Sequence, residues 1–253
     1  IFITLVSIMN LKEKQNDSME GKVVMITGAN SGIGYETALG LAKKGARIIM
    51  VCRNRDRAEK ALEQLKEESH SRAIDLYLAD LADQQSIREM VKHFQRDYTR
   101  LDVLINNAGL MMTKRHLTPE GNELTLAINH LGHFLLTWLL LDLLIASAPS
   151  RVINVSSVAH KFANLDLDNL NLEGNFNGLL AYGNSKLANI LFTRELARRL
   201  EGTGVNVNAV HPGTIRTNLG KRFETKWFKY FFGFLRLFMK GVQKGARTPI
   251  YLG

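Results

Sequence analysis

Cysteine is nearly absent from this chain of 253 residues, in which Cys52 is the only one. A single cysteine excludes an internal disulfide framework and is typical of a reducing compartment. The seven histidines are scattered without the spacing of metal ligands, and we expect no metal site. The sequence also lacks internal repeats and low-complexity tracts. At the end of an apolar run, Cys52 is expected to be a small buried residue and not a reactive thiol.

Long apolar runs are missing as well. The opening stretch IFITLVSIM has nine mostly apolar residues, whereas crossing a bilayer takes about 20. No basic segment precedes it and no small-residue cleavage pattern follows, which argues against a secretory signal. The chain begins with Ile1 and not with methionine. We therefore interpret residues 1–20 as a separate apolar and polar segment, the expected remnant of a membrane anchor.

The rest of the chain alternates strand-like and helical patterns. Its 45% apolar content is enough for one substantial core, which predicts a single α/β domain over residues 21–253. Such alternation builds a doubly wound parallel sheet of the Rossmann type, with helices on both faces and ligands at the carboxyl ends of the strands. The segment 158–180, rich in Asn and Gly, is expected to be a long surface loop. The expected strands are 22–27, 47–52, 73–79, 101–106, 151–156 and 205–210.

A glycine-rich turn follows the first expected strand. Gly28, Gly32 and Gly34 have the spacing G-x-x-x-G-x-G, between an apolar strand and a helical pattern. Glycines there let the backbone turn sharply and approach a pyrophosphate, which the amides at the helix N-terminus can bind. Glycine turns between strand and helix also arise for geometric reasons alone. In its strand-turn-helix context, this one predicts a dinucleotide site.

The end of the second strand indicates which dinucleotide. A fold specific for NAD usually carries a carboxylate there for the ribose 2′-hydroxyl, whereas an arginine suits the 2′-phosphate of NADP. Here the strand ends at Arg53, with Arg55 and Arg57 close behind and no acid before Asp56. A guanidinium can bind a phosphate through two hydrogen bonds. The alternative is that these arginines only solvate the start of a helix, but NADP is the expected cofactor.

Tyr182 and Lys186 are the strongest catalytic candidates. They stand four residues apart in AYGNSKLANILFTRELARRL, which puts both on one face of a helix. An ammonium one turn away is expected to favour the phenolate, so that Tyr182 exchanges protons near neutral pH. The alternative is that the tyrosine packs, the lysine is solvated and the spacing is chance.

These motifs and their order resemble the short-chain dehydrogenases/reductases. TGANSGIG, Asp80-Leu81, NNAG at 106–109, Asn129, NVSS at 154–157, the Tyr182 to Lys186 motif and HPG at 211–213 follow one another over residues 20–220. Segments such as AINHLGHFLLT and VHPGTIRTNL are most similar to the retinol dehydrogenases of types 11 to 14. In that family the chain continues with a further strand and helix. The resemblance therefore implies that the domain ending at residue 253 is incomplete at its C-terminus.

The resemblance also implies a role for each motif. Ser157 would hydrogen-bond the substrate oxygen, and Asn129 would help hold a water joined to Lys186 in a proton relay. An Asn on a buried helical stripe could instead be partly exposed or bond neighbouring backbone. Asp80 and Leu81 would lie against the adenine, although an aspartate after a strand is also an ordinary helix cap. The catalytic set is Asn129, Ser157, Tyr182 and Lys186, and the expected cofactor-binding residues are Gly28, Asn30, Ser31, Gly32, Ile33, Gly34, Arg53, Asp80, Leu81, Asn107, Ala108, Gly109, Tyr182, Lys186, Pro212, Gly213 and Thr217.

Residues 221–240 combine six basic residues with eight aromatic ones, in a chain of net charge +9. Such a segment can lie at a membrane interface, with cations toward anionic lipid. In the family this region is a lid over the substrate, so the aromatics could line an apolar pocket instead. No nucleic-acid motif accompanies the charge. We expect an intracellular protein on the cytoplasmic side of the endoplasmic reticulum membrane, and a homo-oligomer is left open.

Together these patterns predict an NADP(H)-dependent oxidoreductase that interconverts a hydrophobic alcohol and its aldehyde or ketone, with retinol/retinal as the leading substrate pair. Steroids and lipid-derived aldehydes are alternative substrates. A regulatory protein that binds nucleotide without turnover is the alternative of a different class, against which the four catalytic candidates argue.

Overall fold

The computed structural model describes residues 18–213 and 242–253. Six parallel strands form one sheet in the order β3-β2-β1-β4-β5-β6. The predicted strand positions are confirmed to within two residues at each end. The strands are β1 (Val23–Thr27), β2 (Arg47–Cys52), β3 (Ile74–Leu78), β4 (Val103–Asn106), β5 (Ser150–Val155) and β6 (Val205–Val210).

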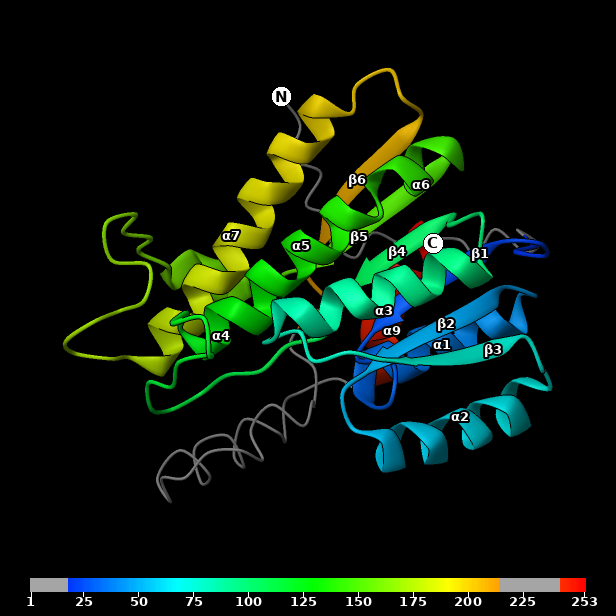
Figure 1. Ribbon diagram of the computed structural model, residues 1–253, viewed down its shortest axis with the longest axis horizontal. Coiled ribbons are helices and arrows are strands. Elements are labelled where there is room, and N and C mark those ends of the chain that lie inside the picture. Colours follow the sequence, from blue (N-terminus) through cyan, green and yellow to red (C-terminus); the bar gives the residue numbers. More distant parts are fainter. Residues whose placement is uncertain (1–17, 214–241) are drawn as a thin grey trace.

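Helices cover both faces of the sheet, as predicted (Figure 1). On one face α1 (Gly32–Lys43), α2 (Arg55–Ser69) and α9 (Val242–Leu252) pack together. On the other lie α3 (Gln84–Asp97), α5 (Gly132–Leu139), α6 (Leu141–Ala146) and α7 (Gly178–Arg199).

Two hydrophobic cores result, because successive residues of a strand point to opposite faces. In β1, Met25 belongs to the core with α3, α5 and α7, and Ile26 to the core with α1, α2 and α9. Both side chains are fully buried. The near-continuous apolar strands are therefore those of a sheet buried on both faces, and the doubly wound, Rossmann-type fold is confirmed.

The helical pattern before β5 is not one regular helix. A short α4 (Leu124–Leu126) leads into a π-helical turn, η1 (Ala127–Leu131), and α5 follows directly. Such turns insert one residue into a helix and are frequent at functional sites. Asn129 lies within η1, so the irregular turn coincides with a predicted site residue.

The predicted loop 158–180 is shorter than expected. Its start forms a 3₁₀ turn, η2 (Val158–Phe162), and α7 already begins at Gly178. Asn177 caps α7, because its side chain accepts hydrogen bonds from the amides of Leu179 and Leu180. The prediction missed these two boundaries since Asn in an Asn-rich stretch indicates a turn as readily as a cap.

Among the described residues, no helix has both the length and the apolar content that a membrane crossing requires. The expected anchor remnant (1–20) falls almost entirely outside the described part of the chain, as do all of residues 221–240 and Thr217.

Candidate active site

Predicted site residues that follow strands lie together at the carboxyl edge of the sheet, because all six strands are parallel. Gly28 follows β1, Arg53 follows β2, Asp80 lies two residues beyond β3, and Asn107 follows β4. Ser156 and Ser157 follow β5, and 211–213 follow β6. Lys186 comes from α7, and its Nζ is 3.5 Å from the point where a Cβ on Gly109 would lie. The glycine turn and the Tyr182 to Lys186 motif therefore belong to one region.

The glycine turn is shaped for close backbone approach. A Cβ on Gly34 would come within 2.5 Å of the carbonyl oxygen of Gly28 and of Asn107 Nδ2, so no larger residue fits there. Gly28 and Gly32 have φ angles of 68° and 60°, in the left-handed region that glycine adopts most easily. Ser31 precedes α1 without capping it through its side chain. The first amides of α1, which lack intrahelical partners, are thus suited to a phosphate, and the turn fits a dinucleotide.

Arg53 extends from the end of β2 toward Asp80. Its Nη1 lies 3.5 Å from Asp80 Oδ2, and the Arg53 side chain is about half exposed. Asp80 Oδ1 accepts from the amide of Ala82, whereas the cap of α3 is Asp83. The reading of Asp80 as a helix cap is therefore wrong. Leu81 is buried and would touch a Cβ placed on Gly132.

Asn129 is fully buried and bonds the turn after β4. Its Oδ1 accepts from the amide of Leu110 at 2.8 Å, and its Nδ2 donates to the Leu110 carbonyl at 2.9 Å and to Ser185 Oγ at 3.0 Å. The side chain thus bonds backbone close to it in space, one of the alternatives from sequence. Its main-chain oxygen accepts from two further side chains, Asn189 Nδ2 at 3.0 Å and His133 Nδ1 at 3.1 Å.

Tyr182 of α7 and Ser157, which follows β5, lie within hydrogen-bonding distance of each other. Burial raises the pKa of Tyr182, and a hydrogen bond with the Ser157 side chain lowers it only in part. The expected lowering of this pKa by Lys186 does not occur. Tyr182 is therefore a neutral phenol at neutral pH. Ser156, by contrast, is buried and donates to the Lys186 carbonyl at 2.8 Å, so it ties β5 to α7.

Lys186 is buried, with 2% of its surface exposed. Its Nζ donates to the Val155 carbonyl at 2.9 Å and lies 5.7 Å from the centre of the Tyr182 ring. Burial lowers the pKa of Lys186 to about 8, because a desolvated ammonium loses stability relative to the neutral amine. A lysine poised near neutral pH beside a phenol is suited to proton exchange.

Sequence reasoning missed three polar residues that connect these groups. Asn189 donates to the carbonyls of both Asn129 and Val155, and Thr27 and His133 bond each other. For two of them spacing was a usable signal: Asn189 lies three residues after Lys186 and His133 four after Asn129, so each shares a helix face with a predicted residue.

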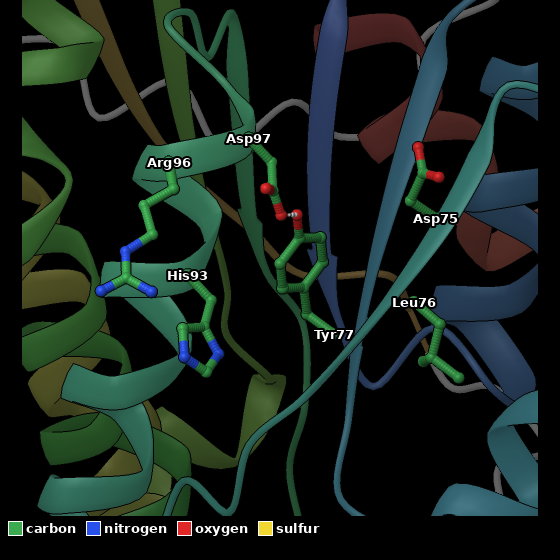
Figure 2. A pocket seen from close by; sticks show the side chains of 6 residues that line it. All are labelled: Asp75, Leu76, Tyr77, His93, Arg96 and Asp97. Atoms are coloured by element: carbon green, nitrogen blue, oxygen red, sulfur yellow. Dashed lines mark hydrogen bonds between the residues drawn. The ribbon is translucent and has the colours of Figure 1, made fainter.

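A separate hollow of about 410 Å³ lies between β3 and α3 (Figure 2). It is lined mostly by polar side chains, with Leu76 as the apolar exception, and in it the Tyr77 hydroxyl bonds Asp97. None of the predicted site residues lines it. We assign it no part in the chemistry.

Comparison with known proteins agrees with this geometry. The family model described as short chain dehydrogenase matches residues 22–227. Human retinol dehydrogenase 14 is 47% identical, over 92% of this chain and 74% of that protein. Relatives named retinol dehydrogenase 11, 12 and 13 match at 42–49% identity.

Solved structures also resemble this chain. An uncharacterized protein from Mycobacterium paratuberculosis superposes with a TM-score of 0.73 at 37% identity, over 92% of this chain and 76% of that one. The NADP active-site complex of Pseudomonas aeruginosa RhlG matches with a TM-score of 0.66 at 28% identity, over 85% and 78%. The chain therefore belongs to the short-chain dehydrogenase family and is an oxidoreductase.

Proposed function

We propose that this oxidoreductase uses NADP(H) to interconvert a hydrophobic alcohol and its aldehyde or ketone, with retinol/retinal as the first pair to test. The observation that carries the proposal is the meeting of Tyr182, Ser157 and Lys186 beside the glycine turn. The names of the relatives, retinol dehydrogenases 11 to 14, support the retinoid pair. The NADP complex of RhlG supports the cofactor.

The glycine turn and the strand ends supply the cofactor site in this proposal. Gly34 leaves room for close approach, and Arg53 offers a guanidinium where a 2′-phosphate is expected. NADPH supplies the hydride when it is bound. The residues that would hold it are Gly28, Asn30, Ser31, Gly32, Ile33, Gly34, Arg53, Asp80, Leu81, Asn107, Ala108, Gly109, Tyr182, Lys186, Pro212, Gly213 and, outside the described residues, Thr217.

Tyr182 is the proton donor of the proposed reduction. Its raised pKa keeps the phenol protonated, and a neutral phenol can give its proton to a carbonyl oxygen as negative charge develops there. Ser157 would donate a hydrogen bond to the same oxygen. Lys186, whose pKa is lowered to about 8, would then return a proton to the phenolate.

Asn129 has a structural task in this account. Its main-chain oxygen already accepts from His133 and Asn189, and a water on that oxygen would have to share it with both donors. The proposal therefore rests on Tyr182 and Lys186 and does not depend on a relay water.

Exposed apolar side chains near Ser157 and Tyr182 favour a hydrophobic substrate. They belong to η2 and to the first turn of α7, and η2 packs against α7. Water-exposed apolar groups gathered beside a site are typical of an apolar ligand. These side chains are Val158, Phe162 and Leu179.

Contact with a membrane surface is a further part of the proposal, supported by the charge and aromatic content of residues 221–240. This segment lies outside the described residues, so its support comes from sequence alone. Location at the endoplasmic reticulum and self-association are proposals of the same kind.

The proposal is tested with a panel of retinaldehyde, a steroid ketone, a lipid-derived aldehyde and acetaldehyde, each with NADPH and with NADH. We expect the apolar carbonyls to be reduced with NADPH and acetaldehyde to be poor. A protein that binds NADPH but turns over none of these carbonyls would support the regulatory alternative instead.

A further inference from the structure

His133 is a buried histidine to which no function has been assigned above. It lies in α5, one helical turn after Asn129, with 2% of its surface exposed. Its Nδ1 is 3.1 Å from the main-chain oxygen of Asn129, and its Nε2 is 2.8 Å from Thr27 Oγ1. The imidazole therefore bridges the π-helical turn and the end of β1.

The two contacts fix the tautomer of the His133 imidazole. A carbonyl oxygen only accepts, so Nδ1 must carry the proton, and Nε2 of the neutral ring must then accept from the Thr27 hydroxyl. Burial, with a smaller contribution from the nearby charge of Lys186, lowers the pKa of His133 to about 3. The ring is thus neutral, with each nitrogen in one defined role.

Thr27 carries the connection to the cofactor side. While its hydroxyl donates to His133, its oxygen accepts from the amides of Asn107 and Ala108, both at 2.9 Å. These two residues form the turn after β4 that packs on the glycine turn, since Ala108 lies 3.1 Å from a Cβ placed on Gly28. The Asn107 side chain also donates to the Thr27 carbonyl at 2.8 Å, so Thr27 holds that turn through three hydrogen bonds.

Asn129 carries the connection to the proton-exchange side. The Asn189 amide that bonds its main-chain oxygen also bonds the Val155 carbonyl, at 3.3 Å. The same Val155 carbonyl accepts from Lys186 Nζ. A shift of the Asn129 oxygen would thus be transmitted, through Asn189, to the group that orients Lys186.

We propose that His133 is a positioning residue, which joins the cofactor-binding turn at Asn107 and Ala108 to the Asn129 carbonyl and, through Asn189, to the group that orients Lys186. The inference rests on the proposed function, because its activity readout needs turnover. The plain alternative is a core histidine whose hydrogen bonds serve stability alone.

Two substitutions separate the two contacts. In His133→Asn the side-chain amide replaces Nδ1 and can still donate to Asn129, but it is too short to reach Thr27. In His133→Gln the longer amide oxygen replaces Nε2 and can still accept from Thr27, but the bond to Asn129 is lost. Ser147→Ala is the matched control, because it removes two hydrogen bonds at the C-terminal end of α6, one from the Leu101 amide and one to the Leu143 carbonyl, that do not involve these residues.

We expect His133→Gln to lower kcat about ten-fold with little change in the Kd of NADPH, the effect of one hydrogen bond. We expect His133→Asn to raise the Kd of NADPH about ten-fold and to keep more of kcat. Ser147→Ala should lower Tm without either change. The proposal is overturned if both His133 variants keep wild-type kcat and Kd, or if their losses are equal and scale with Tm as in a purely structural role.

The ring itself can be examined in the wild-type protein, which covers the case in which a variant does not fold. Nitrogen NMR of His133, assigned through its own backbone resonances, should show the neutral Nδ1–H form from about pH 6 to 8. An Nε2–H form, or titration in this range, contradicts the bridge. Neither NMR nor NADPH binding needs turnover, so an inactive wild-type protein with the expected ring form counts against the proposed function and not against the bridge.

Discussion

The ammonium of Lys186 lies 5.7 Å from the centre of the Tyr182 ring, and its hydrogen bond goes to the Val155 carbonyl. The pair is thus close, but the lysine does not lower the pKa of the phenol, which burial raises instead. The cost of desolvation falls on both groups, since the pKa of Lys186 is lowered to about 8. A neutral phenol, beside an ammonium that gives up its proton more easily than usual, is an acid suited to protonating a carbonyl oxygen.

Replacing Tyr182 with Phe removes only the hydroxyl. We expect kcat to fall by roughly 10² to 10⁴-fold, the usual contribution of a general acid, while the Kd of NADPH measured by fluorescence titration changes little. Tyr77→Phe is the control, because that hydroxyl bonds Asp97 in the hollow between β3 and α3. Near-normal turnover by Tyr182→Phe would rule out the assigned acid.

Lys186→Met should make the protein more stable and less active. A buried lysine with a lowered pKa destabilises the folded protein at every pH at which the same lysine is protonated in the unfolded chain. Stability should therefore rise from about pH 8 to about pH 10.5 in the wild type. At pH 7 we expect a gain of about 2 kcal/mol for the variant, after the lost bond to Val155 is allowed for.

Denaturant unfolding of Lys186→Met at pH 7 and pH 10 measures this effect. The difference in unfolding free energy between variant and wild type should shrink at pH 10, where residue 186 is neutral in the folded wild type as well as in the variant. A variant less stable than the wild type at pH 7 contradicts the buried-charge argument.

Arg53→Ala tests the choice of cofactor. One charge-assisted hydrogen bond contributes about 1.5–3 kcal/mol, so the Kd of NADPH should rise at least about ten-fold, and that of NADH much less. Arg55→Ala is the matched control, because that guanidinium pairs with Glu59 on α2. Equal losses for the two cofactors would show that Arg53 does not read the 2′-phosphate.

Gly34→Ala tests the fit of the glycine turn. The added Cβ would meet backbone at 2.5 Å, and overpacking of this kind costs about 1–3 kcal/mol. We expect the Kd of NADPH to rise at least about ten-fold. Gly40→Ala, in the same helix, would meet only the flexible end of Ile250 and should bind NADPH normally; equal weakening in both variants would point to the helix as a whole.

The sequence predicts the sheet well because its strands are buried on both faces, so apolar runs such as 47–52 stand out. Helix boundaries are predicted less well. Asn177 caps α7 from within an Asn-rich stretch, and Asp83 rather than Asp80 caps α3. In both places several residues of the right type compete, and only the backbone geometry selects one.

The site is predicted where a motif has a fixed spacing, as for Tyr182 and Lys186, and missed where contacts join distant segments. Thr27 and His133 are 106 positions apart and bond directly, which no local pattern reveals. The direction of the Tyr182 pKa shift could not be predicted either, because it depends on burial and on where Lys186 Nζ points.

The most direct test of the account is deuteride transfer from NADPH deuterated at the reactive carbon of the nicotinamide, with retinaldehyde as the acceptor. We expect deuterium at the carbinol carbon of the alcohol formed by the wild-type protein, and almost none with Tyr182→Phe, although both proteins bind the nucleotide. A wild-type protein that is folded and bound to NADPH, yet transfers no deuterium to retinaldehyde or to any other carbonyl of the panel, would contradict it.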